Sequence, residues 1–135
     1  MNTTYFLQLV AGNIFHSKPT PSVPTIYYIG LSKTEPNIQG THVTEPSGGG
    51  YARVAIRGSD LTEPTTSGRI TNINTIVFPE ATGSWGTVTH YVIYDAAAGG
   101  HLLMYGALME PCAVSNGADV AFRVGALTLT VANPT

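Results

Sequence analysis

Several side chains in this sequence could take part in a reaction, but each lacks a part that the reaction requires. Cys112 is the single cysteine, and it has no histidine at a recognisable spacing and no helix N-terminus to make its thiol reactive. We expect it to be a small buried residue. Asp60 and Glu63 have the residue types of a glycosidase pair, but the surrounding Gly-, Thr- and Pro-rich sequence offers little apolar context to keep either of them protonated. We interpret them as solvated loop acids.

Patterns that could bind a ligand are also incomplete. His90 and His101 lie on adjacent predicted strands, but zinc sites normally use about three or four protein ligands and no other ligand type is placed to complete the set. The stretch 47–50, Ser-Gly-Gly-Gly, lacks the lysine and the following helix of a phosphate-binding loop, so we interpret it as a flexible loop. Trp85 could stack on a sugar or fill the end of a β-domain, and the second interpretation is favoured. We predict no catalytic residue, no cofactor and no metal.

Charge is unusually sparse in this chain. Asp, Glu, Lys and Arg make up 10 % of the 135 residues, against about 25 % in an average soluble domain. This composition favours a single domain whose surface is partly covered by neighbours in an assembly, and the alternative is a neutral Thr-, Ser- and Gly-rich surface. A net charge of −2 with six scattered basic residues indicates no nucleic-acid partner.

The first 15 residues are too short and interrupted for a signal peptide or a membrane span, so we expect a soluble protein with no membrane partner.

The elements that must position these residues are mostly strands. Between Thr75 and Val131, apolar and polar residues alternate with the period of two that marks a strand. The 101–108 segment is apolar on both faces, and Asn116-Gly117 indicates a type I′ hairpin. Further strands are expected over 26–33, 51–57 and 70–78. We therefore predict an all-β, jelly-roll-like sandwich of about seven to eight antiparallel strands. Its predicted core includes Ile29, Leu31, Val54, Ile56, Val92, Leu102, Met104, Phe122, Leu127 and Leu129.

The N-terminal segment is organised differently. Residues 2–4 can cap a short amphipathic helix, and a proline-rich extended strap follows it. We divide the chain into a helix and Pro-rich arm over 1–24 and a β-sandwich domain over 25–135. The arm can pack on its own domain or on a neighbouring molecule. The predicted interface consists of its apolar and proline side chains: Phe6, Leu9, Val10, Ile14, Pro19, Pro21 and Pro24.

Three blocks of the sequence carry a resemblance to a known family. They are EPSGGGYARVAI at 45–56, FPEATGSWGTVTHYVIYDAAAGGHLLMYGAL at 78–108 and ALTLTV at 126–131. From about Ile26 to Val131 the chain resembles a family of small virion structural proteins of tailed bacteriophages, labelled as tail fibre or head decoration proteins. The resemblance implies a β-rich structural subunit of the virion with no catalytic residues.

Two structural roles and one enzymatic role follow as hypotheses. The leading one is a non-enzymatic capsid decoration or cement protein on the capsid surface, which forms a homo-oligomer and binds the major capsid protein or other virion proteins. It is favoured because the sequence has no heptads, no collagen-like repeat and no long shaft. The alternative is a tail or fibre subunit that binds a host receptor. A depolymerase fragment is the third, but it would need a convergent acid-base or nucleophile set, and the sequence indicates none.

Overall fold

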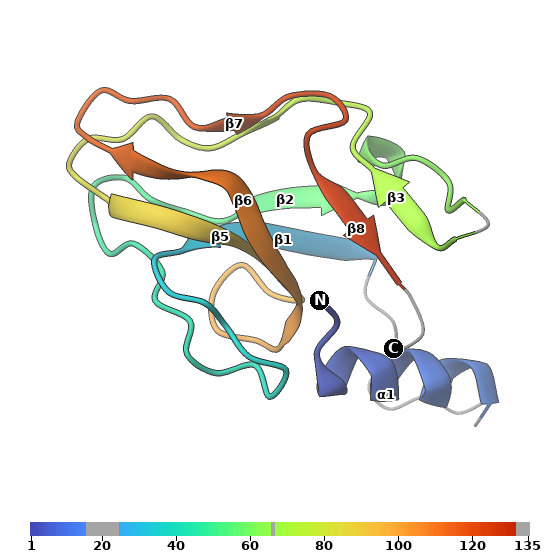
Figure 1. The fold of residues 1–135 in the computed structure, drawn as a ribbon. Helices are drawn as coiled ribbons and strands as arrows, with labels where there is room; N and C mark the ends of the chain where they lie inside the picture. The colour runs from blue at the N-terminus through green and yellow to red at the C-terminus, as the bar shows by residue number, and fades with distance from the viewer. Residues whose placement is uncertain (16–24, 66, 132–135) are drawn as a thin grey trace.

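The computed structural model describes residues 1–15, 25–65 and 67–131. One α-helix, α1 (Thr4–Phe15), precedes the strands, and a short 3-10 helix, η1 (Gly58–Asp60), lies between two of them. All strand pairs are antiparallel, so the predicted all-β fold with a short N-terminal helix is confirmed (Figure 1). The strands in the described residues are β1 (Ile26–Ser32), β2 (Val54–Arg57), β3 (Arg69–Thr71), β4 (Ile76–Val77), β5 (Gly86–Tyr94), β6 (Leu102–Val114), β7 (Ala121–Phe122) and β8 (Thr128–Thr130).

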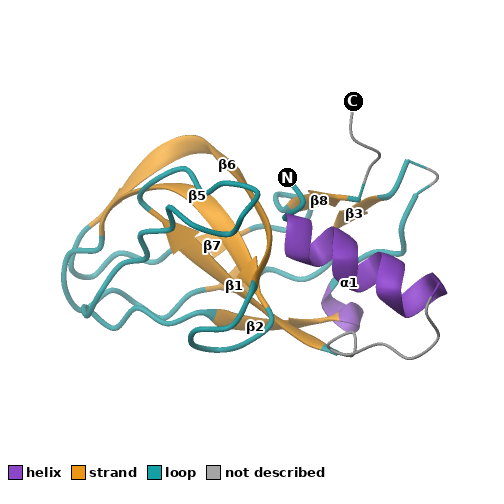
Figure 2. Ribbon diagram, turned by 90° about the horizontal axis from the view of Figure 1, so that it is seen from below, coloured by secondary structure: helices purple, strands orange, loops and turns teal. Residues whose placement is uncertain are grey.

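The strands form one main sheet and two small ladders. The main sheet has four strands in the order β2-β1-β5-β6, while β3 pairs with β8 and β4 pairs with β7. Figure 1 shows both ladders on the same side of the main sheet, and Figure 2 shows α1 at one end of the molecule, next to β3 and β8. The layers are those of a sandwich, but the division into four, two and two strands does not confirm the jelly-roll description.

Both faces of the main sheet are buried along β5. The larger core cluster lies between the sheet and the ladders and includes Leu31, Phe78 and Leu127. A smaller cluster, formed by residues such as Val92 and Tyr105, has Val43 of the long loop between β1 and β2 packed against it. This arrangement explains why four successive residues at the end of β5 are buried. In a sheet with one face exposed to solvent, only every second residue of the strand would be buried. Of the ten predicted core residues, eight are buried, and Val54 and Phe122 are half-buried at the rim.

Two predicted elements differ from the structure. The expected strand over 70–78 is broken, because the buried side chain of Asn72 donates to the carbonyl of Arg123 (2.9 Å) and accepts from the amide of Leu127 (3.0 Å). These bonds tie the chain to the segment between β7 and β8. The prediction of a type I′ hairpin at Asn116-Gly117 is wrong, because only Gly117 has a positive φ (87°), and β6 and β7 pair with different strands. The turn at 116–117 connects β6 of the main sheet to β7, which pairs with β4.

Cys112 is exposed, so the prediction of a buried thiol is also wrong. The reason is the position of β6 at the edge of the main sheet, where near Cys112 only β5 pairs with it. Its register with β5 is interrupted between Val88/Cys112 and His90/Ala107, which leaves four residues of β6 opposite one residue of β5. Met109 in this bulge is 98 % exposed. The bulge carries Glu110 and Pro111, and a charge and a proline at a sheet edge disfavour pairing with a further strand.

Candidate interface

The helix α1 is held against β6 by backbone pairing of the residues that precede it. The amide of Thr3 donates to the carbonyl of Leu103 (3.0 Å), and the amide of Tyr105 donates to the carbonyl of Met1 (3.1 Å). Thr3 is fully buried, and its hydroxyl donates to the carbonyl of Leu102 (2.7 Å) while it accepts from the amide of Phe6 (3.2 Å). Thr3 is therefore the N-cap of α1 and also the residue that fixes the helix to the sheet edge.

One face of α1 packs on the β-domain. Leu9 is buried in the larger core cluster, and Tyr5 and Phe6 pack against that cluster as half-buried side chains. The ring of Tyr5 stacks on His101, with the ring centroids 4.0 Å apart and an angle of 8° between the planes. A small apolar gap of about 150 Å³ remains between Phe6, β6 and β8, lined by side chains such as Met104 and Leu129. The inward face thus carries the aromatic and aliphatic side chains that a sheet-packed helix needs.

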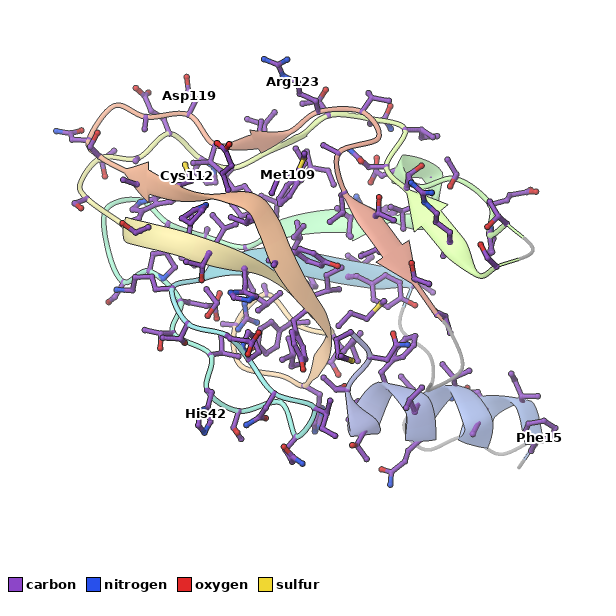
Figure 3. All side chains as sticks on the ribbon, in the orientation of Figure 1. Phe15, His42, Met109, Cys112, Asp119 and Arg123 are labelled. Carbon is purple, nitrogen blue, oxygen red and sulfur yellow. The ribbon has the colours of Figure 1, made fainter. Side chains whose placement is uncertain are left out.

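The opposite face of α1 is apolar as well. Leu7, Ala11, Ile14 and Phe15 follow the spacing i, i+4, i+7 and i+8, which places them on one side of a helix. Leu7 is 40 % exposed, Ile14 64 % and Phe15 82 %. Figure 3 shows Phe15 at the outer end of α1, away from the sheets. We call these four residues the outward stripe. A helix that is apolar on both faces is typical of one that is covered on both sides.

Three segments near this stripe contain no charged residue. Segments 1–15, 96–109 and 124–131 contain no Asp, Glu, Lys or Arg. They are neighbours in space, because α1 contacts β6 and the apolar gap is lined from all three segments. The 14 charged residues of the chain lie in other segments. These three segments are therefore without side-chain charge, whereas Arg69 of β3 and Asp95, which contacts His101, carry charge at the same end of the molecule.

At the other end of the sheet, the glycine-rich loop wraps around Trp85. The indole of Trp85 donates to the carbonyl of Gly49 (2.8 Å), and Gly49 has a positive φ of 58°. Trp85 is buried and its ring meets Tyr51 edge to face at 5.3 Å. This placement confirms that Trp85 fills the end of the β-domain and does not offer its face to a sugar. The two most distinctive sequence blocks, SGGGYAR and SWGTVTH, are thus in contact with one another.

A half-buried ion pair lies at the opposite end of β5, beside the turn that leads into β6. Arg53 contacts Glu45 at 2.6 Å, donates to the carbonyls of Ala96 and Gly99 at 2.8 Å each, and lies 3.6 Å from the centroid of the Tyr94 ring. Burial raises the pKa of Glu45, but the hydrogen bonds from Arg53 and Tyr51 and the charge of Arg53 outweigh it, so the pKa of this carboxyl lies below its usual value. The cluster is satisfied internally and offers no free group for chemistry.

Comparison with known proteins decides the family. A family model described as podophage GP4 fiber I protein gp80 matches residues 3–130. The chain belongs to this family. A search of curated proteins finds no match. The predicted membership of a family of phage virion structural proteins is thereby confirmed, and the family description supports a fibre component at least as well as capsid decoration.

In this member of the gp80 fibre family, the residues that the sequence offered as catalytic or metal-binding candidates are not brought together into one site. Leu102 pairs with Tyr94, so His101 lies beyond the end of β5, roughly 17 Å along the strand from His90. Asp60 is engaged in the η1 turn, where it accepts from the amide of Arg57 (2.9 Å), while Glu63 is exposed. In the described residues, no group of three or more His, Cys, Asp or Glu side chains is placed to hold a metal ion. No helix among them has both the length and the apolar character needed to cross a membrane.

The predicted interface residues fall in different environments. Leu9 and Phe6 face the β-domain, Val10 is half-buried and Ile14 is exposed. Pro19, Pro21 and Pro24 lie outside the described residues. The outward stripe adds Leu7, Ala11 and Phe15, which the sequence reasoning did not single out. Their spacing was the signal that could have revealed them, because it repeats the helical period a second time, half a turn from Leu9.

Proposed function

We propose that this protein is a non-enzymatic structural subunit of a podophage tail fibre. The family match over residues 3–130 is the observation that carries the proposal. Capsid decoration, the first hypothesis from the sequence, explains the sparse charge and the absence of a shaft equally well, but it has no support from the family description. Fibre membership is therefore preferred.

The contacts within the domain support a structural role. Its most polar internal group, the cluster of Glu45, Tyr51 and Arg53, is saturated by contacts within the chain. His90 lies 2.8 Å from the hydroxyl of Thr89 and 3.7 Å from Glu35, and His101 lies 3.3 Å from Asp95. These contacts do not include the single thiol, Cys112, or the acids Asp60 and Glu63 in the loop after β2, so they do not join into one larger reaction centre. We infer that the protein acts by binding other virion components or a host surface, and that its compact domain positions the contacting segments.

The location of the protein on the particle tests this proposal. Antibody raised against the purified chain should label the tail region of intact virions in electron micrographs, with a few to a few dozen copies per particle by quantitative mass spectrometry. Virions without the protein should keep their heat stability and lose adsorption to the host. Labelling of the head surface, several hundred copies and loss of DNA on heating would instead support capsid decoration and contradict the proposal.

A further inference from the structure

The turn between β6 and β7 contains a side chain that can react with the backbone of the next residue. Asn116 is followed by Gly117, and both residues are exposed. The amide nitrogen after an asparagine can attack the carbon of the side-chain amide, and glycine leaves this nitrogen unhindered because it has no Cβ. Every other asparagine of the sequence is followed by Thr, Ile or Pro. Thr and Ile crowd the nitrogen with a branched Cβ, and Pro has no amide proton. Asn116 is therefore the asparagine at which the sequence favours this reaction.

The reaction is a deamidation through a cyclic imide. The nitrogen of Gly117 loses its proton and forms a bond to Cγ of Asn116, and the side-chain nitrogen takes up a proton and leaves as ammonia. Water then opens the ring at either of its two carbonyls, which leaves an aspartate or an isoaspartate. Water is the only co-reactant. The first step requires that the nitrogen of Gly117 give up its proton and turn towards Cγ.

The structure holds this nitrogen in a hydrogen bond. The amide of Gly117 donates to the carbonyl of Ala81 (2.7 Å), and the amide of Ala81 donates to the carbonyl of Ala118 (3.0 Å). The amide of Ala118 donates to the carbonyl of Ser115 (3.0 Å), which closes the turn. The φ of 87° at Gly117 fits the third position of a type II turn. The proton that the attack must remove is thus bound to an acceptor, and the nitrogen is fixed in direction.

The acceptor belongs to a segment that is itself firmly held. Ala81 is buried in the larger core cluster, and the amide of Thr82 donates to the carbonyl of Gly49 (2.8 Å). The amide of Trp85 donates to the carbonyl of Val114 (2.9 Å), just before the turn. Figure 1 shows the connection between β4 and β5 beside the turn, at the end of the molecule remote from α1. The bond of Gly117 therefore breaks only when the turn lifts away from residues 81–85.

We propose that Asn116 is a deamidation site that the hydrogen bond from Gly117 to Ala81 keeps unreactive in the folded chain. The reaction then proceeds only while the turn is open, so its rate is proportional to the open fraction. Each 1.4 kcal/mol of opening free energy lowers the rate about tenfold. The inference goes beyond the fibre role and does not rest on it. Either product would place a second carboxylate three residues before Asp119, and isoaspartate would also lengthen the backbone of the turn.

Mass spectrometry at mildly alkaline pH tests the proposal. The purified full chain is compared with a synthetic peptide of residues 113–120, in which the turn is not held. The full chain should deamidate at residue 116 at least about tenfold more slowly than the peptide. Asn116→Ser removes the site and gives the background from other residues. Hydrogen exchange at the amide of Gly117 should be slow in the full chain, although this residue is exposed.

A variant that disturbs the acceptor gives the second readout. Ala81→Val enlarges a buried side chain and should displace the carbonyl that accepts from Gly117. Hydrogen exchange at Gly117 and deamidation at Asn116 should then become faster by the same factor. Val92→Ile is the matched control, because it also enlarges a fully buried side chain but lies in the smaller core cluster. Its two rates should equal those of the wild type.

A full chain that deamidates as fast as the peptide would overturn the proposal. Slow deamidation together with rapid hydrogen exchange at Gly117 would overturn it too, because the protection would then have another source. The same holds if the deamidation rate of Ala81→Val does not follow its exchange rate at Gly117.

Discussion

Arg53 connects three parts of the chain through one planar guanidinium. It pairs with Glu45 in the long loop after β1, donates to two carbonyls of the turn between β5 and β6, and covers the ring of Tyr94. Lysine has a single ammonium and cannot make this set of contacts at once. Because the pair is half-buried, removing one partner should cost about 1–3 kcal/mol, the range for a lost hydrogen bond to a charged group. The contacts of Arg53 therefore fix the loop onto the outer face of the main sheet.

Acid should weaken the protein through Glu45. The pKa of this carboxyl in the folded state lies below its ordinary value of 4.5, so the folded form holds its proton less tightly than the unfolded form. The stabilisation is then complete above about pH 5 and is lost as the pH falls through the folded pKa. Urea unfolding between pH 7 and pH 3 should show a steeper loss for the wild type than for Glu45→Gln, which begins on the order of 1–3 kcal/mol less stable at pH 7.

Glu63→Gln is the control for this titration, since Glu63 is exposed in a loop. Its curve should follow the wild type over the whole range. Identical slopes for the wild type and Glu45→Gln would show that the ion pair does not control acid stability.

Gly30 of β1 lies directly against the side chains of Glu45 and Tyr51, which leave no room for a side chain at this position. A Cβ at this position would lie 2.5 Å from the hydroxyl of Tyr51 and 2.9 Å from Oε2 of Glu45. Gly30→Ala should therefore displace both groups and lower the free energy of unfolding by about 1–3 kcal/mol. Gly58→Ala is matched, because nothing lies within 4 Å of its added Cβ and its φ is not positive. Chemical denaturation that shows equal stability for the two variants would contradict this role of Gly30.

At the scale of elements, α1 depends on a single buried threonine. Thr3→Val keeps the shape of the side chain but removes both the cap of Phe6 and the bond to Leu102. We expect a loss of about 1–3 kcal/mol and faster hydrogen exchange in the first turn of α1. Thr3→Ser retains the hydroxyl and should lose less. Unchanged exchange in Thr3→Val would mean that β6 pairing alone holds the helix.

Elements with a regular hydrophobic period could be predicted from the sequence. The alternation along β5 predicted a strand there, and the doubly apolar start of β6 predicted its burial on both faces. The breaks could not be predicted in this way. Asn72 interrupts an apolar run because of bonds to residues more than 50 positions away, and Asn116-Gly117 forms a turn whose two sides join different sheets. Local patterns do not contain such long-range partners.

The same distinction between local patterns and long-range contacts holds for the candidate interface. The sequence indicated an interface on the N-terminal helix because of its apolar residues, but a helical period alone does not tell which of two apolar faces meets the domain. The anchoring of Thr3 on β6 decides it, and this is a contact across 100 residues. Glu45, Tyr51 and Gly30 likewise come together only through the path of the long loop.

The length of β6 has a mechanical consequence. It pairs with β5 from end to end, and the nine residues of β5 span roughly 26 Å at about 3.3 Å per residue, from the anchor of α1 to the neighbourhood of Trp85. Hydrogen bonds between antiparallel strands lie perpendicular to the strands, so a pull along β6 loads all of its bonds to β5 together in shear. Tension that enters through α1 would thus be shared by the longest strand pairing among the described residues. The bonds to Met1 and Thr3 are far fewer, and the helix should detach under force before the β-domain opens.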